Sequence, residues 1–245
     1  MAAAPVFPTS TTLHTWDPFY CFVEGPAGTF VVEVVGLDQK MRDRMLGRAV
    51  GGAAAFVKDD GYACDVFLPV SSDLAIRLSY NPYKKAGACR TASDLAGAAA
   101  SVLSRPEAVR MDPMWDACSV LAAAVDPDVD RSKLLGSKLS NCGDLSTAHS
   151  GFVTFDNVVR SQERPETRTI GGKSVRMYEE DESCDIYWRQ GPFPARFAET
   201  PDYQVRVSAP DCAKVVTLAE SVIGVLDQPP SADVEPQRPL LYPAN

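Results

Sequence analysis

The fold is decided by CDIYWRQGPFPARFAETPDYQVRVSAPDCAKVVTLAESVIGVL, residues 184–226. An earlier stretch, residues 64–103, has the same layout. Its segments CDVF and IRLS align with CDIY and VRVS of the later stretch. In each stretch a second cysteine, Cys89 or Cys212, then opens a run of small and apolar residues that ends before a proline. The chain therefore contains one structural unit twice.

The match also extends upstream. Val50-Gly51-Gly52 and Ile170-Gly171-Gly172 precede their CDVF and CDIY segments by the same number of residues, with an acidic turn between. Two copies indicate a tandem duplication, since a solenoid needs at least about three repeats. With the two copies aligned in this way, both glycines, the first cysteine and the following aspartate are identical in the two copies.

Each copy changes its hydrophobic period once. Apolar residues first alternate, as in Cys184, Ile186 and Trp188, which is typical of half-buried strands. They then recur at helical spacing, as from Cys212 to Leu226. We therefore predict an α+β protein of two tandem copies, each an antiparallel sheet covered by a helix and stapled by disulfides.

Four cysteines recur with the repeat. One lies on the inward side of a strand and its partner opens the core face of the helix, so we predict the bonds Cys64–Cys89 and Cys184–Cys212. The alternative is buried free thiols, because cysteine is among the most buried residue types. The recurrence favours disulfides and hence an oxidising compartment outside the cytoplasm.

The other three cysteines are harder to pair. Cys21 and Cys118 both follow an Asp-Pro step, which suggests that they correspond. Cys142 lies in a stretch without a counterpart in the first copy, so we pair Cys118 with Cys142 and leave Cys21 over. The alternative pairs Cys21 with Cys118 and frees Cys142, and connectivity does not follow from sequence.

Composition sets the domain plan and excludes some partners. The sequence predicts a tether over 1–15, repeats over 16–106 and 107–228, and a proline-rich tail over 229–245. A net charge of −8 argues against nucleic acid and anionic membrane surfaces as main partners. The first residues lack signal-peptide features, so oxidised cysteines would imply an export signal or anchor outside this sequence.

A resemblance can now be stated. The Asp-Pro step followed by a cysteine, the glycine-led strand, the cysteine-containing strand and the closing helix that begins at a cysteine resemble the secreted domains of uncharacterised actinobacterial envelope lipoproteins. The resemblance covers most of both halves and implies an exported protein anchored outside the membrane. It supplies no catalytic residues, and this chain departs from it in having two copies and no lipidation cysteine near residue 1.

Motifs for catalysis or metal binding are weak. Asp126, Asp128 and Asp130 have the spacing of a calcium loop, but Arg131 stands where that loop needs glycine. His149 lies among serine and aspartate residues without a nucleophile-elbow motif, which is more typical of a surface loop. We expect no cofactor and no metal site.

Acidic and paired charges have structural interpretations. The run Glu179 to Glu182 occupies the position of a hairpin turn, and solvation explains it better than cation binding. Asp65 with Arg77 and Asp185 with Arg206 fall on the outward side of the sheet, as exposed cross-strand ion pairs or, alternatively, as a shared polar binding face.

Aromatic residues suggest a binding patch in the second copy. They are Tyr187, Trp188, Phe193 and Phe197, near Pro192 and Pro194. Together they could form a patch for a ligand or partner, whereas core packing is the plainer interpretation for each.

The function we expect is non-catalytic binding of an envelope component, or of an exported or membrane protein. The alternatives are a carrier of a lipid or other apolar ligand, and a cell-wall hydrolase that uses Asp, Glu or His149.

Overall fold

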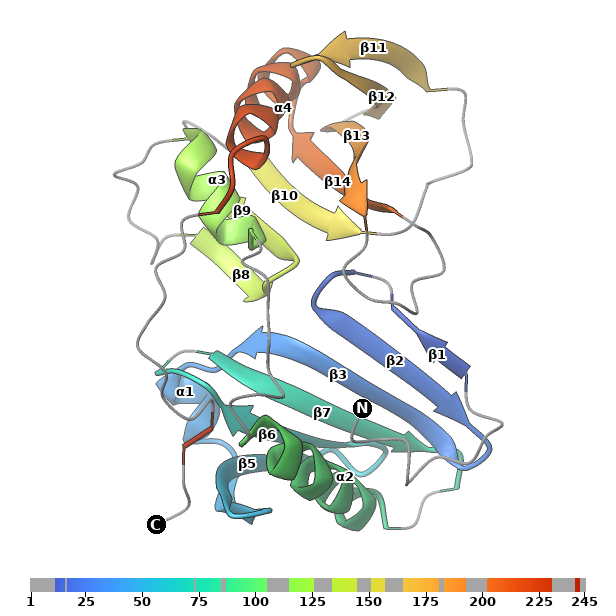
Figure 1. Cartoon of the computed structure of the whole chain (residues 1–245), viewed down its shortest axis with the longest axis vertical. Coiled ribbons are helices and arrows are strands. Elements are labelled where there is room, and N and C mark those ends of the chain that lie inside the picture. Colours follow the sequence, from blue (N-terminus) through green and yellow to red (C-terminus); the bar gives the residue numbers. More distant parts are fainter. Residues whose placement is uncertain are drawn as a thin grey trace. The chain divides into compact units, whose positions relative to one another are not determined.

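A computed structural model of the 245-residue chain gives the fold. It describes residues 12–15, 17–72, 74–84, 87–104, 115–125, 134–144, 151–156, 165–180, 183–192, 202–230 and 241–242. The chain divides into two compact units, and each is an antiparallel sheet with helix on one face (Figure 1). The predicted α+β architecture of two sheet-plus-helix copies is confirmed.

Unit 1 contains the first copy. Its elements are β1 (Thr12–His14), β2 (Tyr20–Gly25), β3 (Gly28–Gly36), α1 (Gln39–Arg42), β4 (Leu46–Val50), β5 (Ala53–Asp59), β6 (Cys64–Pro69), β7 (Leu74–Pro82) and α2 (Ala88–Leu103). The strand order is β4-β5-β6-β7-β3-β2-β1, and every neighbouring pair is antiparallel.

Unit 2 contains the second copy. Its elements are α3 (Ala117–Val125), β8 (Leu134–Lys138), β9 (Asn141–Asp144), β10 (Gly151–Asp156), β11 (Glu166–Ile170), β12 (Lys173–Glu180), β13 (Ser183–Pro192), β14 (Asp202–Ala209) and α4 (Cys212–Leu226). The strand order is β11-β12-β13-β14-β10-β9-β8, again antiparallel throughout.

The two sheets share one topology and one register. In unit 1 a row of facing residues runs Val66, Leu78, Val32 across β6, β7 and β3. In unit 2 the equivalent row runs Ile186, Val207 across β13 and β14 and continues to Val153 on β10. These rows lie beneath the helix in both units, so the alternation in the sequence correctly marks the core face.

The paired glycines have a conformational reason. Gly51 and Gly171 have φ of +58° and +55°, and the glycines that follow them are also left-handed, as a two-residue hairpin turn requires. A Cβ on Gly51 would lie 2.7 Å from the Gly97 carbonyl oxygen of α2. The glycine therefore makes the turn and lets the helix approach the hairpin.

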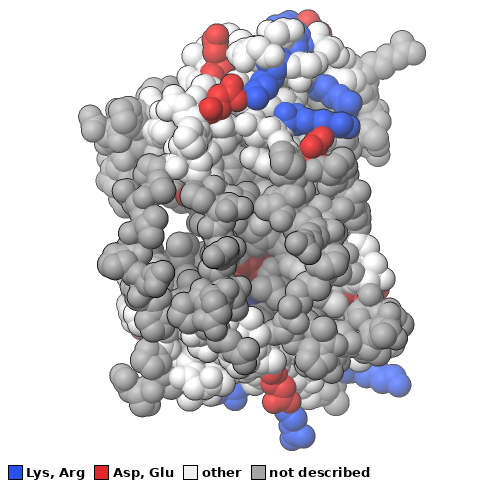
Figure 2. Space-filling model, in the orientation of Figure 1, with Lys and Arg blue, Asp and Glu red and all other residues white. Residues whose placement is uncertain are grey.

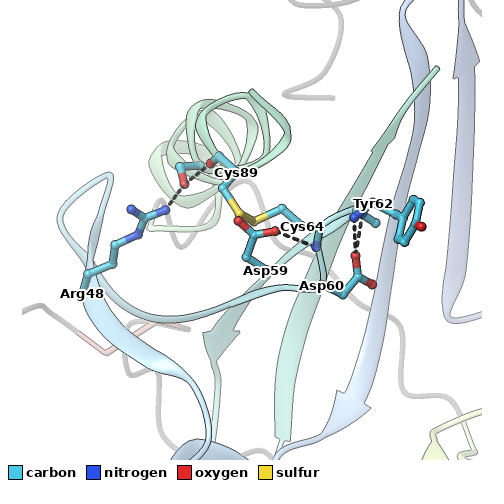
Figure 3. The surroundings of a disulfide bond; sticks show 9 residues. Arg48, Asp59, Asp60, Tyr62, Cys64 and Cys89 are labelled. Carbon is cyan, nitrogen blue, oxygen red and sulfur yellow. Dashed lines mark hydrogen bonds between the residues drawn. A yellow bond between two sulfur atoms is a disulfide. The ribbon is translucent and has the colours of Figure 1, made fainter. Parts of the chain in front are cut away.

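The disulfides join helix to sheet. Cys64 on β6 bonds to Cys89 on α2, with a Cα–Cα distance of 4.9 Å (Figure 3). Cys184 on β13 bonds to Cys212 on α4, with a Cα–Cα distance of 5.0 Å. Cys118 bonds to Cys142, so all three predicted pairs are present. Each bond ties a helix to the sheet beneath it.

The hairpin before Cys64 is held by its acidic residues. The Asp59 carboxylate accepts a hydrogen bond from Gly61 N, and the Asp60 carboxylate accepts from Tyr62 N and Ala63 N (Figure 3). These backbone donors hold the pKa of Asp60 below its ordinary value. The acidic turn of this copy thus has a structural role.

The correspondence of Cys21 with Cys118 is wrong. Cys21 lies on β2 and faces Val32, whereas Cys118 lies on helix α3. The register match of Cys21 is Cys142, which lies on β9 and faces Val153. Cys21 is the free cysteine and packs partly buried against the helix-side core, where burial raises the pKa of its thiol.

Some segments differ from the sequence expectation. The sequence indicates no clear element over 38–49, where the structure has the single turn α1, capped by Asp38, and strand β4 at Leu46–Val50, which pairs with β5. Thr12–His14, within the expected tether, pairs with β2. Leu241, within the expected tail, is 6% exposed in the helix-side core of unit 1.

Candidate functional site

The two faces of each sheet have different chemistry. The face under α3 and α4 in unit 2 is the apolar core, which includes Val153, Ile186 and Val207. On the opposite face, β11 to β14 present mostly polar side chains. Strand pairing brings Arg176, Tyr187 and Arg206 into one row across β12, β13 and β14 on this helix-free face.

A hollow of about 460 Å³ opens on this helix-free face. Its lining residues are Thr167, Lys173, Ser174, Arg176, Tyr178, Tyr187, Trp188, Arg189 and Gln204. We call this the β12–β14 hollow. In unit 2, Lys and Arg side chains gather over β11 and β12 (Figure 2). No acidic residue is among the described residues that line it.

The arginines at the hollow differ in their partners. Arg176 is exposed and forms no hydrogen bond or ion pair within the described part of the chain. Arg189 is 69% exposed, and its Nη1 is 3.8 Å from Asp202 Oδ2. The register sets Arg176 opposite Tyr187 and Arg189 two residues further along β13, so the two arginines are diagonal neighbours. Lys173 forms an ion pair with Asp227, with 2.8 Å between Nζ and Oδ1.

Gln204 contributes a side-chain amide to the lining of the hollow. It faces Arg189 across β13 and β14 and is 8% exposed. Its side-chain amide makes no hydrogen bond to any described residue. The amide is not among the fully buried polar atoms that lack a partner, so it is open to solvent at the hollow that it lines.

A buried ion pair fixes the wall of the hollow. Arg206 Nη2 is 2.8 Å from Asp185 Oδ2, and Asp185 is 2% exposed. The Tyr187 hydroxyl donates to the same carboxylate at 3.3 Å, and the Arg206 guanidinium lies over the Tyr187 ring at 5.7 Å. Tyr178 packs edge-on against Tyr187, with ring centroids 5.4 Å apart. These contacts hold the tyrosines in place.

The predicted ion pairs are only half right. Asp185–Arg206 is present, but it is buried rather than solvated. Arg77 instead pairs with Glu33, which faces it across β3 and β7, so the predicted Asp65–Arg77 pair is wrong. In unit 2 the residue equivalent to Glu33 is Thr154, which faces Arg206 but has no charge, so Arg206 pairs with Asp185 instead.

The aromatic residues of the predicted patch separate. Both Tyr187 and Trp188 border the hollow, but Trp188 also belongs to the helix-side core, and its Nε1 donates to Gln190 at 2.8 Å. Neighbouring strand residues point to opposite faces, which explains the separation. Phe193 and Phe197 lie outside the described residues.

The sequence candidates for calcium binding and for catalysis cannot be placed in the fold. Asp126, Asp128, Asp130 and His149 lie outside the described residues. Among the residues that are described, no group of three or more His, Cys, Asp or Glu side chains is placed to hold a metal ion.

Arg176, Arg189 and Gln204 were not singled out from sequence. The signal was present in the repeat, since Arg176 stands where the first copy has Phe56, and Gln204 where it has Ala75. A polar residue that replaces an apolar one between two copies of one fold marks a difference that the fold does not need.

Fold and site together define a class: a duplicated, disulfide-stapled α+β protein with a donor-lined hollow on one sheet. No protein-family model and no curated protein matches the chain. Among solved structures, it is similar to the immunity protein TplEi of the T6SS from Pseudomonas aeruginosa in complex with "L" peptide. The match has 9% identity, covers 88% of this chain and 96% of that chain, and has a TM-score of 0.30, too low to carry an argument.

Two findings bear on location. Three disulfides are typical of proteins that mature in an oxidising, extracytoplasmic compartment. None of the helices in the described ranges has the length and apolar character needed to cross a membrane.

Proposed function

We propose that this protein is a non-catalytic binding protein on the outer side of a cell membrane, where it recognises an envelope component or part of another exported protein. The observation that carries this proposal is the β12–β14 hollow. It concentrates hydrogen-bond donors and two tyrosines on the helix-free face of one sheet. A volume of about 460 Å³ falls within the usual range of pockets for small ligands.

The lining favours binding over chemistry. General acid–base catalysis needs a titratable group within reach of the substrate, with a pKa near the working pH. The described lining residues are arginines, a lysine, tyrosines, an amide, hydroxyls and an indole. Asp185, the carboxylate on β13, is buried, and its Oδ2 is paired with Arg206 and with the Tyr187 hydroxyl. This set of lining residues can position a ligand, and it includes no carboxylate or histidine among the described residues.

The lining also favours a hydrophilic ligand over a lipid. A carrier of apolar molecules needs a largely apolar cavity, whereas guanidinium, amide and hydroxyl groups border this hollow. The resemblance to secreted envelope domains supports an exported protein, and we propose that the full-length protein is held at the membrane by an anchor.

The test is an NMR titration of the oxidised protein with solubilised fragments of envelope polymers and with peptides from exported proteins. The proposal predicts amide shifts that cluster on β12, β13 and β14, and a ligand that is recovered chemically unchanged. Ligand turnover, or shifts absent from these strands with every fragment, would contradict it.

A further inference from the structure

The duplication gives the hollow an internal control. Strand pairing sets Arg176 opposite Tyr187 in unit 2 and Phe56 opposite Phe67 in unit 1, so these positions are equivalent. The same register makes Gln204 equivalent to Ala75, which faces Pro69 as Gln204 faces Arg189.

Unit 1 fills its version of this face with apolar side chains. Phe67 and Ala75 are buried there with Val35 and Leu37, and Phe56 packs against them. Unit 1 therefore forms the same sheet with phenylalanine and alanine at positions where unit 2 has Arg176 and Gln204. Because the fold does not require these polar groups, another role must account for them.

Among the described residues, these donors of unit 2 have few acceptors. Arg176 has five N–H groups and no partner among the described residues. Arg189 is 69% exposed, with only a long contact to Asp202. Gln204, 8% exposed as a residue, lines the same hollow, and its amide is not among the fully buried atoms that lack a partner, so a ligand in the hollow can reach it. Two guanidinium groups on neighbouring strands, with no acid among the described lining, suit a planar or tetrahedral anion.

The charge of the whole chain sharpens this preference. The protein carries a net charge of −8, so its average surface repels anions. An anion that binds in the hollow therefore has to be held by short-range contacts with the hydrogen-bond donors there, because the net charge of the protein does not attract it. Ser174, Thr167 and Gln204 add hydroxyl and amide groups beside the arginines, which suits a ligand that carries hydroxyls around its anionic group.

We propose that the β12–β14 hollow is an anion site that takes a carboxylate or phosphate group carried on a small hydroxyl-rich ligand such as an acidic sugar. Arg176 and Arg189 bind the anion, and Gln204 binds a neighbouring oxygen. Asp185 and Arg206 are positioning residues that hold Tyr187. This proposal rests on the proposed binding function and names its ligand class.

The test is isothermal titration calorimetry with four probes: a hexose 6-phosphate, a hexuronate, inorganic phosphate and the uncharged hexose. The variants are Arg176→Gln, which removes the unpaired guanidinium, and Arg90→Gln, which makes the same charge change at an exposed position on α2. We expect the anionic sugars to bind and the uncharged hexose not to bind. R176Q should weaken binding at least about tenfold, as expected for a lost charge-assisted hydrogen bond, and R90Q should leave it unchanged.

The outcomes separate the two proposals. If the hexose 6-phosphate binds more tightly, the site prefers phosphate, and if the hexuronate binds more tightly, it prefers carboxylate. Either result supports the anion site. Binding of the uncharged hexose as tight as that of the anions, or equal binding by R176Q and the wild type, would overturn the anion site. Envelope fragments that shift β12–β14 amides while no anionic probe binds would also overturn it, but the binding function would stand.

Discussion

Removing the Cys184–Cys212 disulfide tests how unit 2 is stabilised. The bond closes a loop with a sequence separation of 28 residues between β13 and α4. On the chain-entropy relation, a loop of this length stabilises the folded state by about 3.6 kcal/mol at 25 °C. The variant C184A/C212A should lose about that much free energy of unfolding, plus a smaller amount for the buried sulfur atoms.

The assay is urea unfolding followed by tryptophan fluorescence. Trp115 and Trp188 both belong to unit 2, so their signal reports on the unit that carries this bond. The midpoint should fall, and the urea dependence should steepen because the uncrosslinked chain exposes more surface on unfolding. The single variant C184A should cost about as much, since either change removes the same cross-link. A loss below about 1 kcal/mol in both variants would refute the stapling role.

Three further outcomes are expected. Arg206→Met should lower the free energy of unfolding by about 3–5 kcal/mol in the same urea assay, because it leaves the Asp185 carboxylate buried without its cation; a change below about 1 kcal/mol would contradict the pairing. Burial raises the pKa of the Cys21 thiol, so its thiolate fraction at pH 7 is reduced; alkylation by iodoacetamide, followed by mass spectrometry, should be slow at pH 7, accelerate as pH rises and become fast in urea, whereas fast modification of the native protein at pH 7 would be inconsistent. Gly51→Ala should cost more than Gly52→Ala by thermal melting, because both have positive φ but only the Cβ of the first would collide with α2, and equal losses would argue against the close approach.

The repeat made much of the fold predictable. Alternation from Cys184 to Trp188 marked a strand, and the helical period after Cys212 marked α4, because both patterns reflect which side chains one core buries. The recurrence of cysteines at these two places was enough to pair them with each other. Inward-facing residues on neighbouring elements leave few other partners.

The features of the fold that the sequence did not predict depend on pairing between strands that are distant in the chain. Cys21 matches Cys142 only once β2 and β9 are seen at the same place in the two sheets, whereas its Asp-Pro context pointed to Cys118. Leu46–Val50 is a strand because β5 lies beside it, and its local composition carries no such signal. These outcomes depend on long-range contacts.

The site was less predictable than the fold. Tyr187 was singled out for its aromatic ring, but its role depends on Arg206 and Asp185 on the same face. Arg176 and Gln204 belong to no sequence motif, so no pattern predicts a role for them. The comparison with Phe56 and Ala75 of the first copy would have indicated them, since a change from apolar to polar at one position of a duplicated sheet is visible in sequence.

The most direct measurement is a crystal structure of the oxidised protein with the hexose 6-phosphate bound. The account predicts the phosphate beside Arg176 and Arg189, with a sugar oxygen within hydrogen-bond distance of the Gln204 amide, on the helix-free face of β12 to β14. A ligand bound on the Phe56 face of unit 1, or an empty hollow at saturating ligand, would contradict it.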